Sequence, residues 1–197
     1  SDIGKMRSDN QDFMESCHLD GHRLFVLADG VGGQHGGQEA SRTAVKSVIG
    51  FFRKKAASLS PAELLERSIS YAHDQVLKAG VKKSLPGMGT TIVAALLHEG
   101  KAWAAHVGDS RAYFLRKGQL RLLTLDHTQA HSLVLTGMIP SEALRDHPLS
   151  HILMRSVGVE SFLVRLFFAH TISDVVHSLC VVRRIRISKT HLRIIQL

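Results

Sequence analysis

The sequence has few of the features that mark secreted, disulfide-linked or membrane-spanning proteins. Its two cysteines, Cys17 and Cys180, lie far apart and near no other cysteine, so neither a disulfide framework nor a zinc site is indicated. No apolar run reaches the roughly 18 residues that cross a bilayer, and the first residues lack the charged-then-apolar pattern of a signal peptide. We therefore expect a soluble protein of the reducing cytoplasm that does not act at a membrane.

Acidic residues are scarce in the last quarter of the chain. The net charge is +8, and residues 1–150 carry 18 Lys and Arg against 15 Asp and Glu, whereas residues 151–197 carry 7 against 2. A basic excess can bind nucleic acid, but no aromatic residue interleaves with the basic cluster at 183–186. Since a short charge run is usually solvated, nucleic acid is not the expected partner.

The 197 residues, 44% of them hydrophobic, suffice for one sizeable core, and nothing suggests two independent folding units. Apolar residues at helical spacing predict an amphipathic helix over 38–57, and Ser60-Pro61-Ala62-Glu63 is a capping box that opens a second helix. Strand patterns cover 23–28, 89–97, 101–107, 112–115 and 119–123, and a turn at Glu99-Gly100 joins the second and third of them as a hairpin. Short helical pieces follow at 132–135 and 141–145. Two helices between groups of strands indicate an α+β fold with a helical layer on a sheet.

Two of the predicted strands end in an aspartate next to glycine. Asp29 follows the apolar run 24–28 and precedes a glycine cluster, and Asp109 follows the strand 101–107 and Gly108. Carboxylates and nearby carbonyl oxygens are ligands that suit Mg²⁺ or Mn²⁺, and two strand ends can converge at one edge of a sheet. For Asp29 alone, the ordinary interpretation is a solvated turn.

A polar cluster from Arg7 to Asp12 precedes the first clear strand. Its ordinary explanation is a solvated loop between strands. Alternatively, the planar guanidinium of Arg7 could bind phosphate oxygens while Asp12 holds a metal-bound water. Four histidines further along have no zinc-site spacing, so we expect most of them to be surface or capping residues: His127, His131, His147 and His151.

Taken together, these segments resemble the protein phosphatase 2C-type, metal-dependent serine/threonine phosphatases, especially the small bacterial ones. The matching motifs, in chain order, are 7–12, Asp29-Gly30-Val31-Gly32-Gly33, Met88-Gly89-Thr90-Thr91, the run 106–113, Asp126-His127-Thr128, and 147–148 through 155–158. The resemblance implies a four-layer α-β-β-α sandwich of two antiparallel sheets flanked by helices. It covers residues 1–159, a phosphatase-like domain, and leaves residues 160–197 as an atypical basic tail that replaces the rest of the domain.

The resemblance also implies a chemistry. In such enzymes two Mg²⁺ or Mn²⁺ ions, with a third in some members, activate a water that attacks phosphoserine or phosphothreonine. By the same resemblance, Asp29 is the bridging carboxylate, Gly30 a carbonyl ligand and Asp12 a carboxylate that holds metal-bound water. Arg7 is the phosphate clamp and Asp109 a ligand of the further metal site.

The sequence departs from the family pattern at some of these positions. Gln11 stands where many relatives have Glu, and Gln34 stands where many have His, with His35 beside it. After residue 160 the family pattern predicts a Ser-Asp-Gly strand end and a final Asp-Asn pair, and neither occurs. Residues 161–197 contain one acid, Asp174, against six Lys or Arg, as expected of a frameshifted or truncated product or of a lineage-specific ending.

Two hypotheses follow from the resemblance and the departures. The first is a metal-dependent phosphoprotein phosphatase, acting as a monomer on phosphorylated proteins of a serine/threonine kinase pathway. The alternative is a phosphatase-like binding module that has lost turnover because its C-terminal metal-binding acids are missing.

Overall fold

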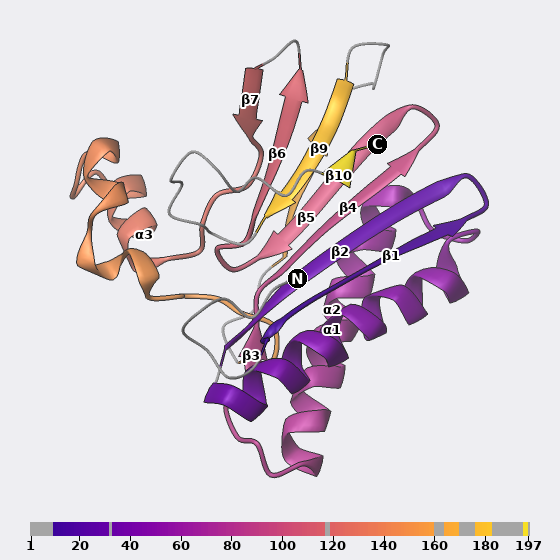
Figure 1. Ribbon diagram of the computed structural model, residues 1–197, viewed down its shortest axis with the longest axis horizontal. Helices are drawn as coiled ribbons and strands as arrows, with labels where there is room; N and C mark the ends of the chain where they lie inside the picture. The colour runs from indigo at the N-terminus through magenta and orange to yellow at the C-terminus, as the bar shows by residue number, and fades with distance from the viewer. Residues whose placement is uncertain are drawn as a thin grey trace.

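The computed structural model describes residues 10–31, 33–116, 119–159, 164–169, 176–182 and 195–196 (Figure 1). These residues form two antiparallel sheets and a pair of long helices. Among the described helices, none has both the length and the apolarity to cross a bilayer.

The larger sheet has the order β1-β2-β4-β5-β8, and β3 pairs with the end of β2. Its strands are β1 (Asp12–Leu19), β2 (His22–Val31), β3 (Gly89–Thr90), β4 (Ile92–His98), β5 (Lys101–Val107) and β8 (Arg165–Ala169). The second sheet has the order β10-β9-β6-β7 and consists of β6 (Arg111–Arg116), β7 (Gln119–Leu122), β9 (Val176–Val182) and β10 (Ile195–Gln196). Hairpin connections between β1 and β2 and between β4 and β5 place β2, β4 and β5 in the middle of the larger sheet.

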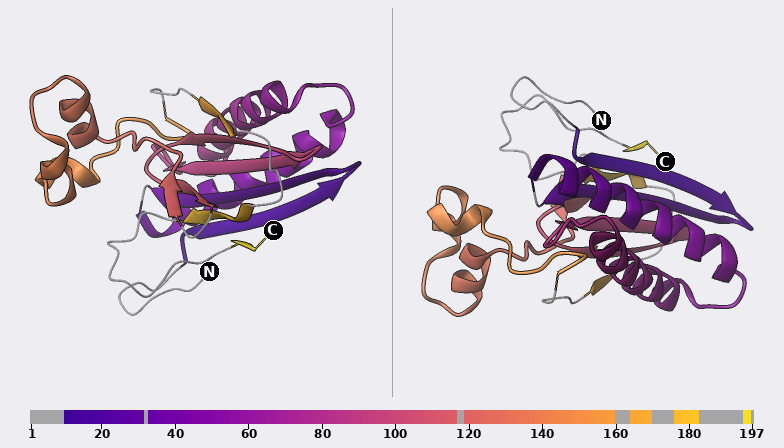
Figure 2. Two further views of the ribbon diagram at one scale, coloured as in Figure 1. Left: turned by 90° about the horizontal axis from the view of Figure 1, so that it is seen from above. Right: turned by 90° about the horizontal axis from the view of Figure 1, so that it is seen from below.

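Helices α1 (Gly33–Lys55) and α2 (Pro61–Lys82) lie side by side on one face of the larger sheet (Figures 1 and 2). Ser60 caps α2: its side chain accepts from the Glu63 N–H, and the Glu63 carboxylate accepts from the Ser60 N–H. This reciprocal arrangement satisfies two donors that a helix start otherwise leaves exposed. The capping box and the proline at the first turn thus fix where α2 begins.

The main core lies between these helices and the larger sheet. Leu24, Val26 and Ala28 of β2 are buried there against apolar residues of both helices, including Phe52 and Ile69. Leu27, which lies between Val26 and Ala28, points to the opposite face of β2. There it packs in a small cluster between the two sheets, together with Val93, Ala95, Ala112 and Leu123. Alternation along β2 therefore separates a helix-facing side from a side that faces the second sheet.

A helical segment between β7 and β8 in the sequence extends from the body of the molecule. It contains α3 (Gln129–Leu135) and two 3₁₀ helices, η1 (Ser141–Arg145) and η2 (Pro148–His151), and it projects away from both sheets in both views (Figures 1 and 2). Its two ends are joined by an isolated bridge between Thr128 and Leu153 and by a hydrogen bond from Gln129 N to Ile152 O (2.9 Å). We call residues 129–152 the excursion.

The predicted α+β fold with antiparallel sheets flanked by helices is confirmed. Helix α2 begins where the capping box predicted, and the predicted turn at Glu99-Gly100 joins β4 and β5 with positive φ at both residues. Two differences stand out. Helix α1 begins at Gly33 rather than at Gln38, and residues 12–19 form a strand, β1, that the sequence patterns did not predict.

Candidate metal centre

Asp12 and Asp29 lie directly opposite each other on neighbouring strands. The register of β1 and β2 pairs Asp12 with Asp29, and the Gly30 N–H donates to the Gln11 carbonyl oxygen (3.0 Å) just beyond. Directly paired residues of antiparallel strands project their side chains to the same face. Because Asp29 is two residues after Leu27, both carboxylates emerge on the side of the sheet that faces the second sheet.

Thr91 holds the end of β2 in place. Its backbone N–H donates to the Asp29 carbonyl oxygen (2.9 Å), and its hydroxyl accepts from the Asp29 N–H (3.1 Å). The same hydroxyl is 2.7 Å from the Ser110 Oγ, and both Thr91 and Ser110 are almost fully buried. Thr91 therefore connects Asp29 to Ser110, the residue that follows Asp109.

Asp109 follows β5 at the same edge of the sheet. Residues Ile92 and Val107 pair at the ends of β4 and β5, so Gly108 and Asp109 continue beside Thr91. Gly108 has φ +103°, and a Cβ there would lie 2.6 Å from Thr91 Cγ2. A glycine is required here because it tolerates both the left-handed backbone and the close approach. We call Asp12, Asp29 and Asp109 the acidic edge.

The backbone at Gly30 packs directly on the start of α1. A Cβ added to Gly30 would lie 2.0 Å from the Gly37 carbonyl oxygen, so no side chain fits at this position. The glycine cluster after Asp29 thus brings the second turn of α1 against the end of β2. This close approach follows from the glycines that the sequence pattern singled out.

Residues after the excursion close the same edge. Thr90 and Val157 form a bridge with two hydrogen bonds, of 2.9 and 2.8 Å, and the Gly158 N–H donates to His73 Nδ1 on α2 (3.1 Å). Burial of the His73 ring lowers its pKa, which favours the neutral ring that can accept this bond. The segment 156–158 is therefore fastened to both β3 and α2.

Asp126 forms a buried ion pair with Arg111. The guanidinium donates to both carboxylate oxygens, from Nε at 2.8 Å and from a terminal nitrogen at 2.6 Å. The hydrogen bond to Asp126 raises the pKa of Arg111, so the pair stays charged. This contact fixes the stretch 126–128, which leads from the second sheet into the excursion.

His127 is the exception among the four histidines, most of which were expected to be surface or capping residues. Its ring is 7% exposed, stacks on the buried ring of His106 at 4.5 Å between centroids, and accepts from the Gly108 N–H (3.1 Å) through Nδ1. His147 does act as a cap, because its Nδ1 accepts from the Leu149 N–H (3.2 Å). The signal for His127 was its position between Asp126 and Thr128, next to a strand end.

The predicted site residues have different outcomes. Asp12, Asp29, Gly30 and Asp109 are all at or beside one sheet edge, whereas Arg7 lies outside the described residues, as do the side chains of Gln34 and His35. Their roles stay predictions. Thr91 and Ser110 belong to the matching motifs, but the sequence analysis gave them no role. A hydroxyl residue at the start of a buried strand is a signal that it anchors neighbouring backbone by hydrogen bonds.

The donors of the acidic edge are all oxygen atoms, which is the donor type that Mg²⁺ and Mn²⁺ prefer. Among the described residues, no group of three or more His, Cys, Asp and Glu side chains is arranged to hold an ion by itself. Mg²⁺ commonly binds through one or two carboxylates and keeps several waters, so the edge fits such an ion in kind.

The comparisons with known proteins agree with this arrangement. Residues 5–189 match the family model described as protein phosphatase 2C. The serine/threonine phosphatase stp of Listeria welshimeri is 38% identical over 167 residues, which are 81% of this chain and 66% of that protein. The chain thus spans just under two thirds of the length of this curated relative.

Solved structures give the same result. The serine/threonine phosphatase Stp1 from Staphylococcus aureus superposes with a TM-score of 0.80 at 30% identity, over 91% of this chain and 72% of that one. The catalytic domain of the serine/threonine protein phosphatase PstP, solved in complex with two manganese ions, gives a TM-score of 0.68 at 28% identity over 86% and 70%. On the strength of the family model and these structures, the chain belongs to the protein phosphatase 2C family.

Proposed function

We propose that this protein is a metal-dependent phosphoprotein phosphatase that hydrolyses phosphoserine and phosphothreonine. The observation that carries the proposal is the acidic edge: Asp12 and Asp29 are paired across β1 and β2, and Asp109 precedes Ser110, which is hydrogen-bonded to Thr91. Membership of the family and the two manganese ions in the solved PstP domain support it.

Each residue has a proposed part in this chemistry. Asp29 and the Gly30 carbonyl would hold Mn²⁺ or Mg²⁺, Asp12 would accept a hydrogen bond from a metal-bound water, and Asp109 would bind a further ion. A bound ion of this kind supplies a water of lowered pKa and neutralises charge on the phosphate. Arg7 would bind the phosphate oxygens through its planar guanidinium, which places the phosphorus near that water.

In this proposal the substrates are phosphorylated proteins of a serine/threonine kinase pathway. The phosphatase acts on them as a monomer in the cytoplasm. The two distant cysteines favour a reducing compartment. In this proposal the guanidinium of Arg7 would bind phosphate without help from the metal-binding acids that the family pattern predicts after residue 160.

Release of phosphate from a phosphothreonine peptide tests the proposal. With Mn²⁺ present, we expect turnover by the unmodified chain and its loss, by about 100-fold or more, in Asp29→Asn, because metal ligands contribute several kcal/mol to such reactions. Asp74→Asn, which changes an exposed acid of α2 far from the edge in sequence, is the matched control and should keep full activity. Isothermal titration with Mn²⁺ should give weaker binding in Asp29→Asn alone. Equal binding by both variants would refute the assignment.

A second candidate function is phosphopeptide binding without turnover. It is favoured by one observation: residues 161–197 contain a single acid, Asp174, where the family pattern predicts further metal ligands. In that case a phosphothreonine peptide binds, binding weakens in Arg7→Ala, and phosphate release stays at background with Mn²⁺ added. Turnover that Asp29→Asn abolishes would exclude this candidate.

A further inference from the structure

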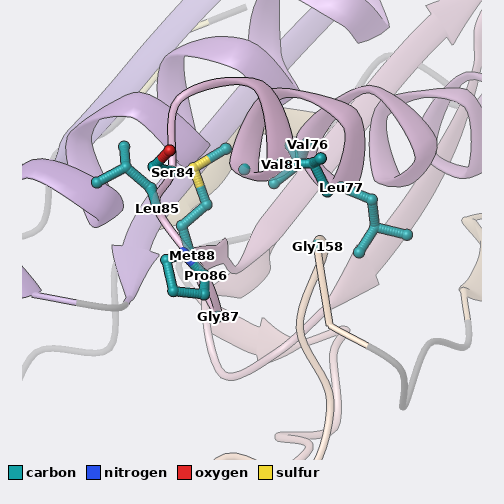
Figure 3. Close-up of a pocket in the computed structure, with 10 residues that line it drawn as sticks. Val76, Leu77, Val81, Ser84, Leu85, Pro86, Gly87, Met88 and Gly158 are labelled. Atoms are coloured by element: carbon teal, nitrogen blue, oxygen red, sulfur yellow. The ribbon is translucent and has the colours of Figure 1, made fainter.

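A groove of about 500 Å³ lies at the C-terminal end of α2, and Asp12, Asp29 and Asp109 are not among its lining residues. Its walls are mostly apolar, and it is lined by Val76, Leu77, Gly80, Val81, Ser84, Leu85, Pro86, Gly87, Met88 and Gly158. Figure 3 shows Leu77 and Val81 of the helix on one side, the loop residues Leu85, Pro86 and Met88 on the other, and Gly158 below the helix. Among the residues that the structure describes, no acidic side chain lines it.

The helix side of the groove exposes large apolar side chains to solvent. Val81 is 85% exposed and Leu77 is 40% exposed, one helical turn apart on the same stripe of α2. Burying side chains of this size would be favourable, so their exposure beside a concave surface indicates a surface that another molecule covers.

The floor of the groove is closely packed around Gly158. Gly158 has φ +93°, and a Cβ there would lie 2.4 Å from Val76 Cγ1 and 2.8 Å from the Met88 carbonyl oxygen. The Gly158 N–H is also held by His73. At Gly158 the floor is therefore formed by backbone that leaves no room for a side chain.

Lysines border this apolar surface. Lys78 and Lys82 follow Leu77 and Val81 by one residue each, so their stripe runs alongside the apolar stripe of α2. Lys83 is also near, but its ammonium is paired with Glu39 at 2.8 Å. Asp74, the acid on the lysine stripe, lies one turn before Lys78 and thus further from Val81. Within the described residues, no ion pair is formed by Lys78 or Lys82.

We propose that this groove docks a segment of a partner protein that carries neighbouring apolar side chains flanked by carboxylates. The apolar side chains cover Leu77 and Val81 and fill the space over Gly158, and the carboxylates pair with Lys78 and Lys82. The positive charges of Lys78 and Lys82 select an acidic segment over a basic one, while the apolar walls provide most of the affinity. This inference does not rest on the proposed phosphatase activity, because the segment needs neither phosphate nor metal.

The probe is a short fluorescein-labelled peptide of leucine and glutamate, with leucines at helical spacing, and its binding to the full chain is measured by anisotropy without metal. We expect binding that weakens about tenfold or more in Val81→Asp, from the loss of one buried apolar contact, and that weakens as salt is raised. Lys82→Glu should also weaken it. Val81→Ser provides a milder variant of the same position, which is too exposed to affect folding.

Matched controls use distant exposed residues of the same kinds. Leu135→Asp changes an apolar residue of the excursion that is 63% exposed, and Lys101→Glu changes an exposed lysine of β5; both should bind the peptide normally. Three results would overturn the proposal: no binding of the leucine-glutamate peptide, equal binding of a leucine-lysine peptide, or equal loss in Leu135→Asp. Sedimentation provides the remaining check, because a dimer that Val81→Asp converts to a monomer would make the groove a contact between copies instead.

Discussion

At the scale of single residues, Thr91 holds the backbone of the acidic edge together. One hydroxyl accepts from the Asp29 N–H and bonds Ser110, and it is buried from solvent. Removing it leaves the Ser110 hydroxyl and a backbone N–H without that partner inside the protein. The cost of an unmatched buried polar group exceeds the net gain from an ordinary hydrogen bond.

We expect Thr91→Val to lower the free energy of unfolding by about 1–3 kcal/mol, because the shape is kept and the hydrogen bonds are lost. Urea denaturation measures this change. Thr136→Val, at an exposed site of the excursion, should stay within about 0.5 kcal/mol of the unmodified chain. A Thr91→Val protein as stable as the control would mean that the edge is held by other contacts.

His73 makes stability depend on pH. Its pKa is lowered by burial, so the unfolded chain takes up a proton near pH 6.5 that the folded chain takes up only at lower pH. The stabilising contribution of neutral His73 is therefore fully present above about pH 6.5 and is lost as the pH falls through the folded-state pKa. Protonation would also remove the acceptor for the Gly158 N–H.

His73→Asn keeps an acceptor near the Nδ1 position but cannot titrate in this range. We expect its unfolding free energy to fall less steeply than that of the unmodified chain between about pH 7 and pH 5. Chemical denaturation at several pH values tests this, with His18→Asn, an exposed histidine of β1, as the control. Parallel curves for the unmodified chain and His73→Asn would contradict the assignment.

At the scale of elements, the start of α2 is stabilised by its capping box. Replacing Ser60 with Ala removes the acceptor for the Glu63 N–H and should cost about 1 kcal/mol. The control is Ser70→Ala on the same helix, where the hydroxyl donates to the Glu66 carbonyl oxygen and Ala has the better helix propensity. Thermal unfolding should thus show a lower midpoint for Ser60→Ala only, and a lower midpoint for Ser70→Ala would argue against capping as the cause.

Elements with strong local signals could be predicted from the sequence. The capping box located α2, and the turn at Glu99-Gly100 located the β4–β5 hairpin. By contrast, β1 contains polar residues on both faces, and its pairing with β2 decides its conformation. Helix α1 begins within glycines of low helix propensity because the Gly37 backbone packs on Gly30, a long-range contact that no local pattern contains.

For the candidate site, the sequence predicted individual residues but not the contacts between them. Asp29 and Asp109 were predictable as acids at strand ends, since each follows an apolar run. Their connection through Thr91 and Ser110 was not, because it depends on the pairing of β2, β4 and β5. The burial of His127 against His106 likewise depends on contacts between segments far apart in the sequence.

At the scale of the whole molecule, the larger sheet is covered on both of its faces. Strand β4 is central in the larger sheet and is buried on both faces, by the helices on one side and the second sheet on the other. Strand β9 belongs to the segment 160–197, which the sequence analysis set apart as an atypical basic tail. That boundary stays a prediction.

Amide hydrogen exchange tests the boundary. We expect slower exchange in residues 92–98 than in residues 176–182, because opening of a strand buried on both faces requires a larger part of the molecule to unfold. Residues 111–116 of β6, which pair with β9, serve as the internal reference for the second sheet. Equal protection of β4 and β9 would place residues 176–182 within the same cooperative unit as the core and would remove the boundary at 159.

The closed base of the excursion has a consequence for evolution and engineering. The chain segments that enter and leave it meet at the Thr128–Leu153 bridge. Next to this bridge, the Met154 N–H donates to the His127 carbonyl oxygen (2.9 Å). A foreign loop or a small domain spliced between Thr128 and Leu153 would therefore arrive with its two ends already adjacent. Lineages could exchange everything beyond this junction as a cassette while the sheets, the helices and the carboxylates stayed as they are.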